Sequence, residues 1–164
     1  MRKRVLACDL SLSSPAFAVM EFDTVSAEET QMYIKHLSHV KTNNKKVHGH
    51  RFTQISDHLQ EIVDEYPPNY VVFEKGFSKF HNVTHTLQRV VGVAIHKLYE
   101  NEVDTIVEIT PTTVKKAITG NGKAKKDQVA RDLKNFVGDI EYKTDDESDA
   151  VAVALTFALQ KGWI

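Results

Sequence analysis

Two aspartates three residues apart, Asp146 and Asp149, are the side chains whose spacing points most directly to chemistry. They begin an apolar segment, running to Leu159, whose composition is that of a buried helix. Residues three apart share a helix face, so both carboxylates point toward whatever the helix packs against. An acidic first turn that stabilises a helix start would explain Asp146. It explains Asp149 poorly, because that carboxylate falls where the buried surface begins and there needs a cation or another partner.

Two more acids end short apolar segments that have the composition of buried strands. Asp9 follows Val5–Cys8, and Glu74 follows Tyr70–Phe73. If these strands are neighbours, their carboxylates can meet the two aspartates of the helix at one point. At about 4 Å and an effective dielectric of about 20, each pair would repel by about 4 kcal/mol, so such a cluster needs a cation. Ligands that are all oxygen select Mg²⁺ or Mn²⁺. Two such ions about 4 Å apart can activate a water and stabilise the leaving oxygen of a phosphodiester.

The net charge of −1 conceals two oppositely charged segments. Residues 111–137 contain six Lys and one Arg against two Asp, a net +5, and residues 138–149 contain one Lys against six acids, a net −5. A basic segment beside an acidic one suits a polyanion held near a metal site. Either segment alone would also be explained as a solvated surface. The clustered lysines of the basic segment are Lys115, Lys116, Lys123, Lys125 and Lys126.

Length and composition predict a single domain, residues 1–164, of an ordinary globular protein, with 41% hydrophobic and 26% charged residues. The lone cysteine, Cys8, excludes an internal disulfide and indicates a reducing, intracellular (cytoplasmic) location. The basic start of the chain is followed by only four apolar residues, too few for a signal peptide or a membrane span, so we expect no membrane association. The turn at Gly120-Asn121-Gly122 is too short and irregular for a phosphate loop, so we expect no nucleotide cofactor.

The periodicity of the apolar residues predicts a sheet that would carry these acids. The first two strands form a predicted hairpin. Residues 52–63 follow helical spacing, and Pro67 ends that helix. The polar, basic stretch Lys41–Arg51 is predicted to be an exposed loop. The order of three strands, a helix, a strand, a helix, a strand and three helices predicts an α/β fold with helices on both faces of a mixed five-stranded sheet. The predicted strands are 5–8, 16–22, 31–40, 70–73 and 105–109, and the later helices are 81–101, 111–118, 125–137 and 143–159.

Four stretches of the sequence together resemble the RuvC family of Holliday-junction resolvases, in the ribonuclease H-like superfamily. They are VLACDLS around Asp9, VVFEKGF around Glu74, ITPTTVKKAITGNGKAKKDQV over 109–129, and DDESDAVAVA around Asp146 and Asp149. The stretches follow the family's order and span nearly the whole chain. The D-x-x-D-A motif alone is weak, whereas four stretches in order, with the basic block between them, are highly specific.

The resemblance implies a ribonuclease H-like fold and an endonuclease that cuts two opposed strands of a four-way DNA junction as a homodimer. It implies that Asp9, Glu74, Asp146 and Asp149 are catalytic metal ligands, for Mg²⁺ with Mn²⁺ as a substitute and two ions in each site. Lys126 and Lys115 would match the family's lysines near the scissile phosphate, and Lys126 would be catalytic. Phe77 would match an aromatic side chain that stacks on unpaired bases. The expected DNA-binding residues are therefore Phe77, Lys115, Lys116, Lys123, Lys125 and Lys126.

The predicted helix from His81 is the candidate for dimerisation. Its stretch Val90–Ala94 gives it more apolar surface than packing against one sheet face requires. The dimer itself is implied mainly by the resemblance.

The sequence also departs from the family after its first acid. The family usually has Asp-Pro-Gly there, whereas this chain has Asp9-Leu10-Ser11, with Ala16-Phe17-Ala18 where a later glycine would fall. Such divergence would fit a viral or mobile-element member. It leaves open a protein that binds junctions with weak cleavage or none.

Two different activities are also compatible with this pattern of strands and acids. One is that of a ribonuclease H-like nuclease that acts on RNA–DNA hybrids. The second is that of an actin-like ATPase, which shares the sheet order, but the sequence lacks the glycine-rich phosphate turns which that fold needs. The clustered lysines could be solvated, and Phe77 could belong to the core.

Overall fold

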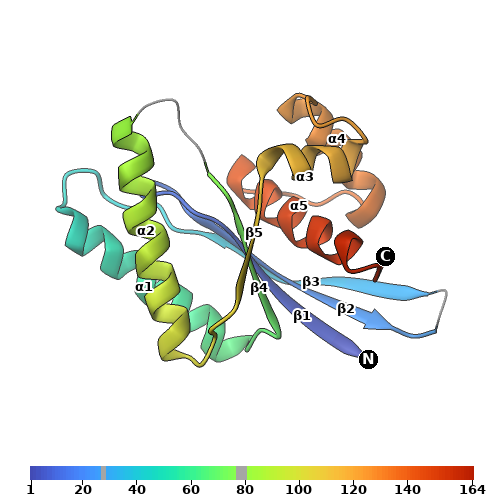
Figure 1. Ribbon diagram of the computed structural model, residues 1–164, viewed down its shortest axis with the longest axis horizontal. Coiled ribbons are helices and arrows are strands. Elements are labelled where there is room, and N and C mark those ends of the chain that lie inside the picture. The colour runs from blue at the N-terminus through green and yellow to red at the C-terminus, as the bar shows by residue number, and fades with distance from the viewer. Residues whose placement is uncertain (27–28, 77–80) are drawn as a thin grey trace.

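A five-stranded mixed sheet forms the centre of the computed structural model, which describes residues 1–26, 29–76 and 81–164 (Figure 1). The strand order is β3-β2-β1-β4-β5, with β1–β2 and β2–β3 antiparallel and β1–β4 and β4–β5 parallel. The strands are β1 (Arg2–Asp9), β2 (Ala16–Thr24), β3 (Thr30–His39), β4 (Tyr70–Glu74) and β5 (Ile106–Ile109). The helices are α1 (His48–Glu65), α2 (His81–Glu100), α3 (Pro111–Thr119), α4 (Lys126–Val137) and α5 (Asp145–Gln160). The predicted fold class, the mixed five-stranded sheet and the order of the elements are confirmed.

The central strand β1 determines which acids become neighbours. It pairs with β4 in parallel, and the last paired residues are Cys8 and Phe73. The residues that follow them, Asp9 and Glu74, therefore leave two adjacent parallel strands at the same edge of the sheet. Parallel strands place their carboxyl ends together, and ligand sites in open α/β sheets form at this edge.

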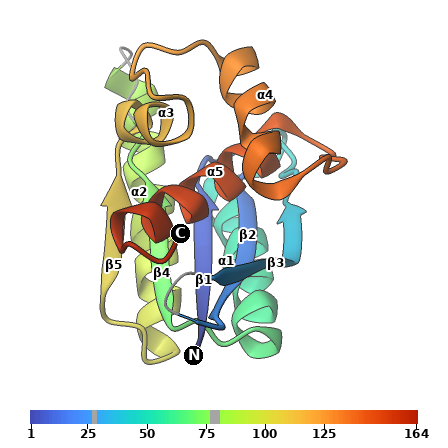
Figure 2. The same ribbon diagram turned by 90° about the vertical axis from the view of Figure 1, so that its right-hand side faces the viewer.

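Helices cover both faces of the sheet, as the sequence predicted (Figures 1 and 2). Alternate residues of β1 point to opposite faces. Val5 and Ala7 belong to the core beneath α5, and Leu6 and Cys8 to the core beneath α1 and α2. Burying one Val or Leu contributes about 1.5–3 kcal/mol, so the two cores hold β1 rigidly between them. Asp9 is the last residue of this strand, so the packing of β1 sets the position of its carboxylate.

Helix α5 is buried continuously from Ala150 to Ala158. The alanines on it let the backbone lie close to the sheet, where the helix contacts β1, β2 and β4. The preceding residue, Thr144, is its N-cap, and the Thr144 hydroxyl accepts a hydrogen bond of 3.3 Å from the Glu147 N–H. The cap sets where the helix begins, and so which face of the first turns meets β1.

The prediction of an exposed loop over Lys41–Arg51 was wrong at its end. Helix α1 begins at His48, and Arg51 in its first turn is only 7% exposed. Its guanidinium donates hydrogen bonds to the Thr42 hydroxyl and the Leu12 carbonyl. The composition of the basic stretch alone does not predict these contacts. Within the described residues, each helix is too short or too polar to cross a membrane.

Candidate functional site

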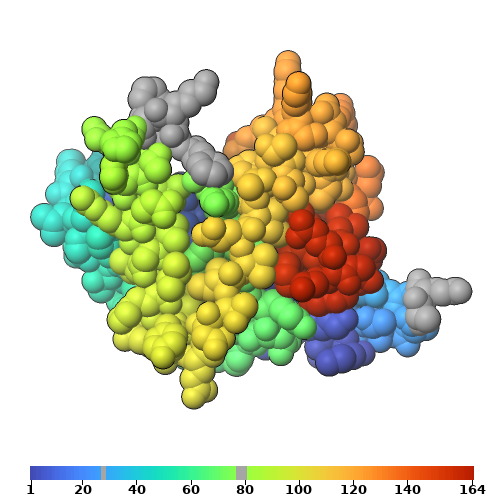
Figure 3. All heavy atoms as spheres, viewed as in Figure 1, coloured from blue at the N-terminus to red at the C-terminus, as the bar shows by residue number. Residues whose placement is uncertain are grey.

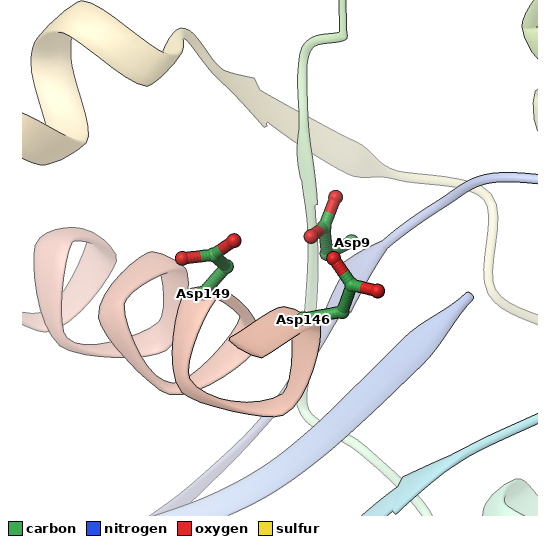
Figure 4. Close-up of side chains that lie close together, drawn as sticks. All are labelled: Asp9, Asp146 and Asp149. Carbon is green, nitrogen blue, oxygen red and sulfur yellow. The ribbon is translucent and has the colours of Figure 1, made fainter. Parts of the chain in front are cut away.

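Three carboxylates meet at the carboxyl end of β1. Asp9, at the end of that strand, and Asp146 and Asp149, in the first turns of α5, each offer an oxygen, and these oxygens all lie within 4.8 Å of one another. The side chains point into one shared space (Figure 4). All three are partly buried. The structure thus brings together three of the four acids that the sequence nominated.

The fourth acid, Glu74, lies at the margin of this group. It is not one of the three carboxylates in mutual contact, but it is close enough for its charge to act on Asp9. Burial raises the pKa of Asp9 to about 8, and the charges of Glu74, Asp149 and Asp146 contribute to that rise. Burial and the charge of Asp149 raise the pKa of Glu74 to about 7. Without a bound cation, both carboxyls therefore take up protons at a much higher pH than ordinary carboxyls do.

Lys126 is the cation closest to the acids. Its Nζ lies 3.0 Å from Asp149 Oδ2 and 3.9 Å from Asp145 Oδ2. Partial burial alone would lower the pKa of Lys126, but the hydrogen bond to Asp149 and the charges of the nearby acids outweigh it, and the pKa is raised. Burial raises the pKa of Asp149, and Lys126 counteracts that rise. Lys126 therefore stays charged and offsets part of the negative potential of the site.

The other basic residues lie on or near α3 and α4. Lys115 is half-buried and close enough to Glu74 for its charge to oppose part of the rise in the pKa of that carboxyl. Lys116, Lys123 and Lys125 are exposed and form no ion pair with the described residues. They project from the surface beside the site without being drawn into it. The predicted stacking residue, Phe77, lies outside the described residues.

Two features of the site had no signal in the sequence. Ser14, in the turn between β1 and β2, donates a hydrogen bond of 2.9 Å to Asp146 Oδ2. Glu147 is 2% exposed, accepts from the Lys143 N–H at 2.8 Å, and lies 2.9 Å from His39 Nδ1. These contacts fasten the start of α5 to the sheet. The partners of Ser14 and His39 are distant in sequence, so local patterns could not have found them.

The donor set fits a hard divalent cation. Its groups are carboxylates, which prefer Mg²⁺ or Mn²⁺, and among the described residues neither cysteine nor histidine belongs to the contacting group. Burial and the neighbouring negative charges raise the pKa of Asp9 and of Glu74, and a bound divalent cation would lower both pKa values again. In the space-filling view, α2 lies on one side of the molecule and α3 and α5 lie on the other (Figure 3).

Comparisons with known proteins agree with this geometry. Residues 9–157 match the family model described as crossover junction endodeoxyribonuclease RuvC. The sequence is 32% identical to crossover junction endodeoxyribonuclease RuvC of Rickettsia massiliae over 160 residues, covering 97% of this chain and 99% of the relative. The fold matches that of Thermus thermophilus RuvC in complex with Holliday junction substrate, with a TM-score of 0.83, 23% identity, and 97% and 94% of the two chains covered. It also matches the yeast mitochondrial Holliday junction resolvase Ydc2, with a TM-score of 0.68, 14% identity, and 98% and 80% covered.

Proposed function

Because the chain belongs to the RuvC family of crossover junction endodeoxyribonucleases, we propose that it resolves four-way DNA junctions by metal-dependent cleavage. The observation that carries this proposal is the contact of Asp9, Asp146 and Asp149 within 4.8 Å, with Lys126 held against Asp149. The carboxylates could hold divalent cations, and the cations and the nearby ammonium suit the cleavage of a phosphodiester, because its scissile phosphate is negative and gains charge in the transition state. The proposed nuclease domain is residues 1–164.

The proposed cofactor is Mg²⁺, with Mn²⁺ able to replace it and two ions in each site. Asp9, Asp146 and Asp149 would hold the ions, and Glu74 would complete the site from β4. When bound, the ions would supply an activated water and stabilise the leaving oxygen. Asp9 and Glu74 must lose their protons to act as ligands, so metal affinity should rise with pH across the neutral range.

The proposed role of the lysines is to position the scissile phosphate and balance its charge. Lys126 lies at the Asp149 end of the cluster, 3.0 Å from that carboxylate, so its ammonium is near the place where a phosphate oxygen would bind. Lys115 would act from the side of Glu74. Lys116, Lys123 and Lys125 would contact phosphates farther along the DNA, and Phe77 would stack on unpaired bases near the crossover. Binding of this kind weakens steeply with salt.

The proposed assembly is a homodimer, formed through α2. The predicted surplus of apolar surface in Val90–Ala94 was wrong in part, because Val90 and Ala94 are buried in the protomer. The exposed apolar side chains lie farther along the helix, at Ile95 and Tyr99, which are 45% and 69% exposed. Exposed apolar side chains on a helix suit a partner's helix. Two copies related by a two-fold axis would present two acidic clusters to the opposed strands of one junction.

The test is cleavage of an end-labelled four-way junction beside a linear duplex of the same sequence and an RNA–DNA hybrid, with Mg²⁺, Mn²⁺ or EDTA. The variants are Glu74→Gln and, as a control with the same chemical change, Glu61→Gln on α1, whose side chain is 79% exposed. We expect metal-dependent cuts near the crossover in the wild type and the control, and loss of cleavage in Glu74→Gln.

Three results would contradict the proposal in different ways. Tight junction binding without cuts in either metal would indicate a binding protein. Cleavage of the hybrid instead of the junction would indicate another ribonuclease H-like activity. Cuts that Glu74→Gln leaves unchanged would exclude Glu74 from the reaction.

A further inference from the structure

A polar cavity of about 540 Å³ lies beside the acidic cluster, next to Asp146. The cavity and the cluster meet at Ser14, which lines the cavity and donates to Asp146, whereas Lys126 contacts Asp149. Among the described residues, no carboxylate lines this cavity. Its polar lining includes Ser13, Ser14, Lys41, Thr42, Asn44 and Arg51.

Arg51 is the unusual member of this lining. It is 7% exposed, and it forms no ion pair with a carboxylate in the part of the chain that the structure describes. Burying a cation costs free energy unless an opposite charge or enough hydrogen bonds compensate for it. Its Nε donates to the Thr42 hydroxyl at 2.9 Å and its Nη2 to the Leu12 carbonyl at 3.5 Å. A guanidinium has five N–H donors, so donors remain for a ligand.

Arg51 also lines a second cavity, of about 390 Å³, along the turn between β1 and β2. That cavity is bounded by Leu10 and Ser11 of the turn and by Asn82 and Thr86 of α2. The guanidinium therefore lines both cavities and is hydrogen-bonded to the turn that joins Asp9 to β2.

We propose that the cavity around Arg51, the Arg51 pocket, binds a backbone phosphate of the DNA strand at the Asp146 end of the cluster. This rests on the proposed function, and it gives the strand a second anchor in addition to Lys126. A phosphodiester supplies the negative charge that the buried guanidinium lacks, and its paired oxygens match the planar fork of Arg.

Neighbouring groups favour an anion at the same place. Lys41 lines the pocket and is exposed, so its ammonium can reach a bound phosphate. Helix α1 begins beside the pocket without a side-chain cap at Val47 and without an acid in its first turn. The positive end of its dipole is therefore not masked by a carboxylate. Hydroxyl and amide groups of the lining supply neutral donors.

The test uses Arg51→Met, Arg51→Lys and Lys41→Gln, each measured in the Glu74→Gln background so that junction binding is separated from cleavage. The control is Lys161→Gln, which removes one charge at the far end of α5. Affinity for the four-way junction is measured over a range of salt concentrations. We expect Arg51→Met and Lys41→Gln each to weaken binding about tenfold and to lower the log–log salt slope by about 0.9. Arg51→Lys should keep the slope, and the control should change neither quantity.

A second measurement identifies the phosphate itself. Each phosphate near the crossover is replaced in turn by an uncharged methylphosphonate. We expect one position at which this replacement weakens binding of the parent protein but no longer weakens binding of Arg51→Met.

Two outcomes would overturn the inference. The first is that both Arg51→Met and Lys41→Gln bind with the salt slope of the parent protein. The second is that every methylphosphonate position that weakens binding of the parent protein also weakens binding of Arg51→Met. In either case Arg51 only stabilises the turn through Leu12 and Thr42. Should Arg51→Met melt at a lower temperature, Lys41→Gln decides, because its exposed side chain is not part of the core. Failure of the proposed function would appear earlier, as a wild type that neither binds nor cuts the junction.

Discussion

Replacing Asp9 with Asn should stabilise the metal-free protein, and by much more at about pH 8 than at about pH 5. Burial and the neighbouring acids raise the pKa of Asp9 to about 8, whereas an unfolded Asp titrates near 3.9. Between these values the folded state binds a proton that the unfolded state does not. The free energy of unfolding of the wild type therefore falls as pH rises through this window, and an Asn at the same position does not titrate.

The size of the effect follows from the pKa shift. Each pKa unit corresponds to about 1.36 kcal/mol, so three pH units between about pH 5 and pH 8 give an upper limit of about 4 kcal/mol. Part of the shift is repulsion from Glu74, which also takes up a proton, with a pKa of about 7, and relieves Asp9. We therefore expect the stabilisation to grow by about 2 kcal/mol over that range, or about 4–8 °C in melting temperature for a chain of this length.

The assay is thermal unfolding in EDTA at several pH values, for the wild type, Asp9→Asn and Asp57→Asn. Asp57 is an exposed residue of α1, so its replacement removes one negative charge without touching the cluster. We expect Asp57→Asn to follow the wild type at every pH. A gain in Asp9→Asn that is equal at the two ends of the range, or a loss at both, would refute the reasoning that Asp9 is buried among negative charges.

Three further predictions address the metal, the lysine and the helix start. Mg²⁺ should raise the melting temperature of the wild type because it relieves repulsion among the acids, and it should raise that of Asp9→Asn by less; a thermal shift equal in the two proteins would contradict this. Lys126→Met should slow junction cleavage by about 100-fold or more while Lys134→Met, which removes a lysine paired with an exposed acid, leaves it unchanged, in single-turnover assays with saturating Mg²⁺. Equal rates in these two variants would show that Lys126 has no part in the reaction. Thr144→Ala should lower the free energy of unfolding by about 1 kcal/mol because it removes the N-cap of α5, and urea denaturation beside Thr53→Ala, an exposed residue within α1, would detect a difference.

The sequence by itself determined the elements and the chemical character of the site. Apolar segments that end in Asp9 and Glu74 are local patterns, and so is the acidic start of the apolar helix α5. Strand and helix periodicities depend on neighbours along the chain, so the order of strands and helices could be predicted. The element boundaries differed by a few residues, most clearly where the basic stretch before Arg51 turned out to begin a helix.

The tertiary structure alone decided which side chains touch. It places Asp9 against Asp146 and Asp149 and leaves Glu74 at the margin, because the reach of each carboxylate depends on how α5 crosses the ends of β1 and β4. Ser14 reaches Asp146 across 132 positions of sequence. Arg51 can be buried because the Thr42 hydroxyl and the Leu12 carbonyl accept hydrogen bonds from its guanidinium, and the residues next to Arg51 in the sequence do not predict these contacts. Such contacts join segments far apart in the chain, and local propensity carries no information about them until the sheet order brings those segments together.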